Sequence, residues 1–149
     1  MATYLTSDQG SYIAPSFEHA TVRDAMRVGV TACAPDAPAV DVARQMATRH
    51  IHAVVVAGVE TGAPGGEHLS WRIASDIDVL RAAPGLESLT AADIAGTAAM
   101  TIGPDAPLSE AAACMAQAGV THLIVADEGR PVGVLSTLDV AGTLAWGRG

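Results

Sequence analysis

Two near-copies of one short stretch decide how this chain folds: Ala34-Pro-Asp-Ala-Pro38 and Gly103-Pro-Asp-Ala-Pro107. They are 69 residues apart, and residues on either side recur at the same offset. Thr21 and Asp24 recur as Thr90 and Asp93. Ala43, Met46 and Ala47 recur as Ala112, Met115 and Ala116, and Val56-Ala57 recurs as Val125-Ala126. This ordered set of matches indicates an internal duplication.

Another matching pair, Ser75-Asp-Ile-Asp-Val79 and Ser136-Thr-Leu-Asp-Val140, follows at an offset of 61. The first copy therefore carries eight more residues than the second. The extra length falls in the Gly-rich segment 58–70, which we expect to be a long hairpin loop.

Each copy is predicted to be a β-α-β-β-α unit that follows a short helical turn. Apolar residues at helical spacing predict helices after each Pro-Asp-Ala-Pro motif, and Val54–Val56 and Leu123–Val125 are typical of buried strands. The expected fold class is α/β (α+β), with two pseudo-symmetric repeats packed sheet to sheet as one module. The predicted divisions are an N-terminal arm at 1–20, a first repeat at 21–84 and a second repeat at 85–149.

Composition excludes several classes of function. The chain has 149 residues and a net charge of −8, and all eight of its basic residues are Arg. An acidic surface without Lys argues against nucleic-acid binding and against docking on anionic membranes. The N-terminus has no signal-peptide pattern and no apolar run approaches the roughly 18 residues of a membrane span, so we expect a cytoplasmic protein. Cys33 and Cys114 match no metal-ligand spacing.

One long stretch of the second copy resembles a known family. It reads Gly119-Val-Thr-His-Leu-Ile-Val-Ala-Asp-Glu-Gly-Arg-Pro-Val-Gly-Val-Leu-Ser-Thr-Leu-Asp139. A strand, a short acidic hairpin and then Gly-apolar-apolar-Ser/Thr-x-x-Asp resemble the cystathionine-β-synthase (CBS) domain family. The first copy departs from this pattern, because Arg72 stands where the Gly is expected. The resemblance extends from residue 21 to about residue 145 and implies a stand-alone CBS pair that forms a homodimer through its helices.

The resemblance also implies ligands and site residues. Paired CBS domains often hold AMP, ADP, ATP or S-adenosylmethionine in clefts between their sheets. The Asp of the motif would bind ribose hydroxyls, the Ser would lie near ribose or phosphate, and the first strand and the start of the second would line the cleft. These roles fall on Asp139, Ser136, Thr101, Ile102, Thr121 and His122 in the second copy, and on Asp78, Ser75, Ala32, Cys33, His52 and Ala53 in the first.

Each assignment has an ordinary structural alternative. Ser-x-x-Asp is also a helix capping box, which needs no ligand. Arg72 is compatible with a phosphate contact, with closure of the cleft, or with a solvated strand position. His50, His52 and His68 are too few and too loosely spaced to predict a metal site.

The sequence contains no catalytic motif, so we expect no enzyme activity and no required cofactor. The expected function is a regulatory module that binds an adenosine-type ligand and signals to an unknown partner protein. ATP would need several cations for its phosphates, and the candidate strands offer few. AMP or S-adenosylmethionine is therefore a more suitable ligand than ATP. A ligand-free interaction module with empty clefts is the alternative.

Overall fold

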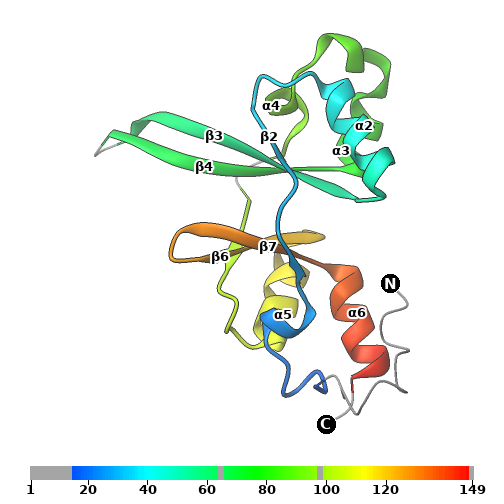
Figure 1. Ribbon diagram of the computed structural model, residues 1–149, viewed down its shortest axis with the longest axis vertical. Helices are drawn as coiled ribbons and strands as arrows, with labels where there is room; N and C mark the ends of the chain where they lie inside the picture. Colours follow the sequence, from blue (N-terminus) through cyan, green and yellow to red (C-terminus); the bar gives the residue numbers. More distant parts are fainter. Residues whose placement is uncertain (1–14, 64–65, 97–98, 148–149) are drawn as a thin grey trace. The chain divides into compact units, whose positions relative to one another are not determined.

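The computed structural model describes residues 15–63, 66–96 and 99–147, which form two compact units (Figure 1). Unit 1 combines residues 15–29 with residues 101–147, and unit 2 contains the described residues from Val30 to Met100. Each unit has a small sheet with helices packed against it, so the mixed α+β class predicted from the sequence is confirmed.

Unit 1 has a four-stranded sheet in the order β1-β7-β6-β5. Strands β6 and β7 form an antiparallel hairpin, β5 runs parallel to β6, and β1 pairs antiparallel with β7. Helices α5 and α6 lie against one face of the sheet (Figure 1). The elements of unit 1 are α1 (Val22–Ala25), β1 (Arg27–Val28), β5 (Thr101–Ile102), α5 (Leu108–Ala118), β6 (His122–Asp127), β7 (Arg130–Ser136) and α6 (Thr137–Trp146).

Unit 2 repeats this plan with a three-stranded sheet in the order β2-β3-β4. Strand β2 is parallel to β3, which pairs antiparallel with β4. A 3-10 helix, η2, follows α3 and was not predicted from the sequence. The elements of unit 2 are β2 (Ala32–Cys33), α2 (Ala39–Arg49), β3 (Ala53–Ala63), β4 (Gly66–Ser75), α3 (Asp76–Ala82), η2 (Ala83–Ser88) and α4 (Ala91–Ile94).

The predicted loop at 58–70 is wrong, because most of this segment is β-structure. Strands β3 and β4 continue pairing from Gly58 opposite Ser70 to Glu60 opposite His68, and Ala63 pairs again with Gly66. Extra residues on both arms of a hairpin satisfy each other's backbone N–H and C=O groups by lengthening the ladder. The Gly-rich composition therefore does not stop the strands here.

The helices begin and end where the repeat predicts. Pro38 and Pro107 are the N-caps of α2 and α5, and Gly119 ends α5 in a left-handed conformation with φ of 65°. In the first copy the same position is His50, with φ of 52°. Glycine takes this conformation without steric cost, whereas a side chain at this φ is less favourable.

Each unit has its own apolar core, and the two cores are filled differently. Leu108, Leu123 and Leu135 are fully buried in unit 1. The equivalent positions in unit 2 are Ala39, Val54 and Ala74, which are smaller. Partly buried side chains that include Leu86 and Leu89 add volume around the unit 2 core.

The helical turns before the repeats dock on turns that are distant in sequence. Val22 N and Arg23 N donate to Ala106 O and Pro104 O at 2.9 and 2.8 Å. In unit 2, Ala91 N and Ala92 N donate to Ala37 O and Pro35 O at 2.8 and 2.9 Å. The turn at the start of the first repeat thus belongs to unit 1, and the turn at the start of the second belongs to unit 2.

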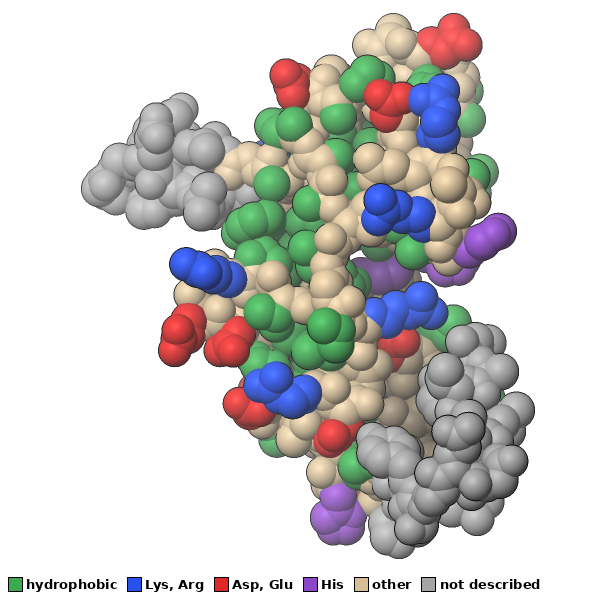
Figure 2. Space-filling view, in the orientation of Figure 1, with side chains coloured by type: hydrophobic (Ala, Val, Ile, Leu, Met, Phe, Trp, Pro, Cys, Tyr) green, Lys and Arg blue, Asp and Glu red, His purple; other side chains and the backbone are tan. Residues whose placement is uncertain are grey.

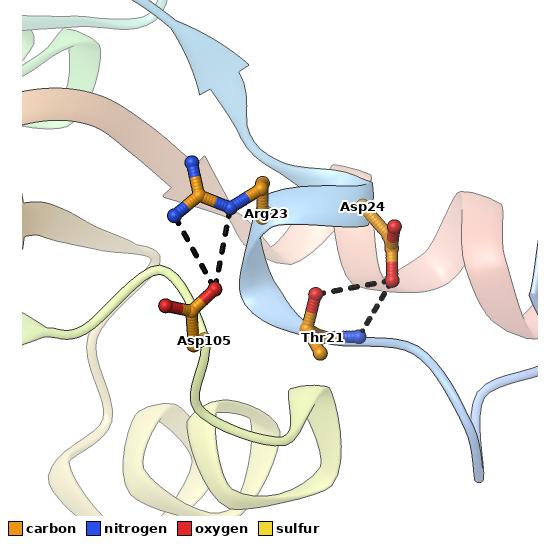
Figure 3. Close-up of polar contacts among 4 residues, drawn as sticks. All are labelled: Thr21, Arg23, Asp24 and Asp105. Carbon is orange, nitrogen blue, oxygen red and sulfur yellow. Dashed lines mark hydrogen bonds and ion pairs between the residues drawn. The ribbon is translucent and has the colours of Figure 1, made fainter.

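An ion pair strengthens this docking in unit 1 alone. Arg23 donates from Nε and Nη2 to Asp105 Oδ1, both at 3.3 Å (Figure 3). The equivalent of Arg23 in the second copy is Ala92, so unit 2 cannot form this pair. Both side chains are more than half exposed, so the pair contributes about 1 kcal/mol or less.

Four of the helices begin with the same capping box, in which an Asp at the third helical position faces a Ser or Thr N-cap. The pairs are Thr21 with Asp24, Ser75 with Asp78, Thr90 with Asp93, and Ser136 with Asp139. In α4 the Asp93 carboxylate accepts from Thr90 N and from Thr90 Oγ1, both at 2.9 Å. These hydrogen bonds, the backbone one first, lower the pKa of Asp93.

We expect Asp93→Asn to destabilise the protein at neutral pH and to have little effect in acid. A carboxyl whose pKa is lower in the folded state stabilises that state above its unfolded pKa of about 3.9. This contribution disappears as the pH falls through the lowered pKa of the folded state. Thermal unfolding midpoints of wild type and variant between pH 2.5 and pH 7 test this, and a gap that stays constant over the range would contradict it.

Candidate functional site

The predicted ligand residues Ser136 and Asp139 lie together where β7 ends and α6 begins. Ser136 N donates to Asp139 Oδ2 at 2.8 Å, and Asp139 N donates to Ser136 Oγ at 3.2 Å. The Asp139 side chain is 10% exposed. One carboxylate oxygen, Oδ2, is therefore engaged in the capping box, which leaves Oδ1 outside it.

The second oxygen of Asp139 faces an arginine that the sequence reasoning missed. Arg27 Nε lies 3.9 Å from Asp139 Oδ1, and the Arg27 side chain is 61% exposed. Arg27 is on β1, more than 100 residues from Asp139 in the sequence. The residue equivalent to Arg27 in the second copy is Gly96. This difference between the copies is the one sequence signal that singles out Arg27.

A pocket of about 610 Å³ lies beside this pair. Ligand pockets for small molecules commonly have volumes of about 300–1,000 Å³. Charged and apolar side chains both line it. The lining residues are Asp24, Ala25, Met26, Arg27, Val28, Leu138, Asp139, Ala141, Gly142, Ala145 and Trp146.

Strand pairing brings His122 next to the capping box. His122 on β6 is in register with Ser136 on β7, so both side chains lie on the same face of the sheet. Thr121 Oγ1 lies 2.9 Å from His122 Nδ1. The other two predicted residues, Thr101 and Ile102, are on β5 at the edge of the sheet, opposite Ile124 and Val125. None of these four residues lines the pocket beside α6.

In unit 2 the equivalent residues Ser75 and Asp78 also form a capping box. Asp78 Oδ2 accepts from Ser75 N at 2.8 Å and from Ser75 Oγ at 2.9 Å. Ser75 is in register with Ala53, and the neighbouring His52 Nδ1 lies 2.8 Å from Asp76 Oδ2. Both hydrogen bonds converge on one carboxylate oxygen here, whereas in unit 1 Ser136 Oγ accepts from Asp139 N.

Ala32 and Cys33 form β2, opposite Val55 and Val56. Cys33 is half-buried, and this burial raises the pKa of its thiol, which keeps it protonated at neutral pH. This environment fits the structural alternative of a small packed side chain.

The two units differ most at the glycine of the family pattern. A Cβ on Gly133 would lie 2.4 Å from Arg27 O, so only glycine lets β1 approach β7. In unit 2 Arg72 takes the Gly133 position and Gly96 takes the Arg27 position. Gly96 N donates to Ile73 O at 3.3 Å, which places it beside β4. In unit 1 the glycine is on β7 and the arginine is on β1. In unit 2 the arginine is on β4 and the glycine is in the segment beside it.

Surface charge is dispersed over the visible part of the molecule. On the face that Figure 2 displays, the blue basic side chains lie apart from one another, and most have red acidic side chains nearby. In the described part of the chain, no three His, Cys, Asp or Glu side chains gather into a possible metal site. No helix within the described ranges is both long enough and apolar enough to cross a membrane.

Each of the two units has a helix that begins with Ser-x-x-Asp, and this repeated pattern matches a known domain family. A family model described as CBS domain matches residues 22–64 and 91–145, which is more than half of the chain. The chain belongs to the CBS domain family. No curated protein sequence matches it closely enough to count as a relative.

Solved structures share this fold at low sequence identity. A hexameric CBS-CP12 protein from bloom-forming cyanobacteria is 16% identical, with a TM-score of 0.71, and the match covers 84% of this chain and 71% of that one. The CBS domain of a bacterial CNNM/CorC family Mg²⁺ transporter in complex with ATP is 19% identical, with a TM-score of 0.70 and coverage of 89% and 92%.

A CBS domain pair in complex with 5′-methylthioadenosine and S-adenosylmethionine is 18% identical, with a TM-score of 0.68 and coverage of 83% and 98%. At such identities these structures establish the fold alone. The CBS pair predicted from the sequence is confirmed by the family match and by these neighbours together.

Proposed function

We propose that this chain is a regulatory, non-catalytic CBS pair that binds a small adenosine ligand, AMP or S-adenosylmethionine rather than ATP. The observation that carries the proposal is the Asp139 carboxylate, which has one oxygen in the capping box and belongs to a residue that lines a pocket of about 610 Å³. A carboxylate oxygen in this position can accept hydrogen bonds from ribose hydroxyls. Among the solved neighbours, two are bound to adenosine compounds.

Charge favours a ligand with few phosphates. Arg27 is the one basic side chain among the residues that line the pocket, and Asp24 and Asp139 line it too. A triphosphate would bring several negative charges next to two carboxylates and one cation, which is unfavourable. A monophosphate or a zwitterionic adenosyl compound fits this balance better.

Signalling would pass through an assembly with other chains in the cytoplasm. Helix α6 exposes Leu144, which does not line the pocket and is more than half exposed, and α3 exposes Ile77 and Leu80 in unit 2. Large exposed apolar side chains on neighbouring turns of a helix are typical of interaction surfaces. We propose that these helices form a homodimer, and that a partner protein binds the dimer according to its geometry. One solved neighbour is hexameric, which agrees with assembly in this fold.

A ligand-free interaction module is the second candidate. Both capping boxes are complete without a ligand, and the remaining Asp139 oxygen already has Arg27 nearby. In such a module the carboxylates would only stabilise helix starts, and the exposed apolar helices would carry the function.

A thermal-shift panel with AMP, ADP, ATP, S-adenosylmethionine and adenosine distinguishes these candidates. We expect one adenosyl compound to raise the melting temperature of wild type, since a ligand that binds the folded state stabilises it by mass action. Asp139→Asn should abolish this rise.

The matched control for Asp139→Asn is Asp93→Asn, which changes the same kind of capping box outside the pocket. It should lower the melting temperature but keep the ligand-induced rise. No rise with any compound, in a protein that melts cooperatively, would instead support the interaction module.

A further inference from the structure

The residues that line the pocket beside α6 include a single cation, Arg27, whose contacts leave it able to bind an anion. We propose that Arg27 makes this pocket select adenosine ligands that carry a 5′-phosphate over the unphosphorylated nucleoside. The inference rests on the proposed function and assigns the phosphate contact of the same site. Nothing in the family pattern around Gly133 and Asp139 specifies this arginine.

The backbone of Arg27 is fixed in place. Arg27 and Val28 pair with Val134 and Gly133 of β7, and Gly29 N donates to Val132 O at 2.8 Å. The missing Cβ of Gly133 is what lets Arg27 O come this close. Only the side chain of Arg27 therefore has freedom to respond to a ligand.

The present contact of Arg27 can be given up at little cost. At 3.9 Å, Arg27 Nε and Asp139 Oδ1 attract each other but are too far apart for a hydrogen bond. The Arg27 side chain is 61% exposed, so this attraction is well screened. A guanidinium has five N–H donors in a planar fork that matches two phosphate oxygens. Arg27 can therefore turn to a phosphate without breaking a hydrogen bond to Asp139.

Each of the two carboxylates that line the pocket has one oxygen already engaged in a capping box. Asp24 lines the pocket, but its Oδ2 accepts from Thr21 N at 2.9 Å and from Thr21 Oγ1 at 3.1 Å (Figure 3). Asp139 Oδ2 is likewise engaged by Ser136 N. When a phosphate binds Arg27, Asp139 Oδ1 becomes available to the ribose hydroxyls. One ligand thus satisfies both charged groups at once.

Unit 2 lacks this arrangement. Gly96 stands at the Arg27 position and has no side chain, and the arginine of that unit, Arg72, extends from β4 at the Gly133 position. Selection for a phosphate by this device is therefore a property of unit 1 alone. We expect one phosphate-selective site per chain.

Isothermal titration of AMP and adenosine into wild type and Arg27→Gln tests the proposal. Loss of a charge-assisted, bidentate contact should weaken AMP binding by roughly 10- to 100-fold. Adenosine, which has no phosphate, should change by less than about threefold. Arg27→Lys should recover part of the AMP affinity and confirms that the charge matters. The control is Arg23→Gln, which removes an exposed arginine of the same segment outside the pocket, and it should leave both affinities unchanged.

The outcomes separate this inference from the proposed function. If Arg27→Gln weakens AMP and adenosine equally, or if wild type binds both equally well, Arg27 does not select phosphate although the ligand site stands. If Arg27→Gln binds AMP more tightly, Arg27 instead obstructs Asp139, which also overturns the inference. If wild type binds neither compound, the inference falls. The proposed function falls with it only if S-adenosylmethionine also fails to raise the melting temperature.

Discussion

Replacing Gly133 by alanine is expected to lower the free energy of unfolding by about 3 kcal/mol, because overpacking against the backbone has no inexpensive relief. The new Cβ would lie 2.4 Å from Arg27 O and 3.1 Å from Met26 Sδ. The methionine can move aside, but Arg27 O belongs to strand β1. Relief therefore requires β1 to separate from β7, with loss of their hydrogen bonds.

Gly103→Ala is the matched control for this change. A Cβ at Gly103 has no heavy atom within 4 Å, and the equivalent residue of the first copy is already Ala34. We expect its effect to be within about 0.5 kcal/mol in urea denaturation. Equal stability of the two variants would show that β1 does not depend on the absent side chain at residue 133. Release of β1 should also remove AMP selection, since Arg27 is on that strand.

Leu123→Ala is expected to destabilise the protein by about 2–5 kcal/mol. Leu123 is fully buried in the unit 1 core, where it packs in one cluster with Leu108, Met115 and Leu135. Removing most of its side chain forfeits apolar burial and leaves a cavity among helices and strands that cannot close around it. Chemical denaturation followed by circular dichroism measures the loss.

The comparison for Leu123→Ala is Leu138→Ala on α6. Leu138 is 52% exposed, so its truncation should change the stability of the monomer far less. If both variants lose the same stability at low protein concentration, the core assignment of Leu123 is wrong. A loss for Leu138→Ala that grows with protein concentration would point to its burial in a dimer.

Much of the fold and part of the candidate site follow from the sequence, because their signals are local. The capping boxes of Ser75 with Asp78 and Ser136 with Asp139 join residues three apart, so the chain itself brings them together. Adjacency of His122 and Ser136 needed only a correct hairpin between β6 and β7. Arg27 escaped prediction because it meets Asp139 through the pairing of β1 with β7, which no local pattern encodes.

The sequence by itself determined the duplication, the order of the helices and strands other than β1 and η2, the helix starts and the family, since periodicity, capping and turn residues act over a few positions. Tertiary structure alone decided three features. Most of the described part of segment 58–70 is paired strand because each arm of the hairpin supplies the other's hydrogen-bond partners. The turns α1 and α4 dock on Pro104–Ala106 and Pro35–Ala37, whose backbone carbonyls accept their N–H groups. The Arg27 side chain reaches Asp139 because Gly133 lets two strands approach that are over 100 residues apart in sequence.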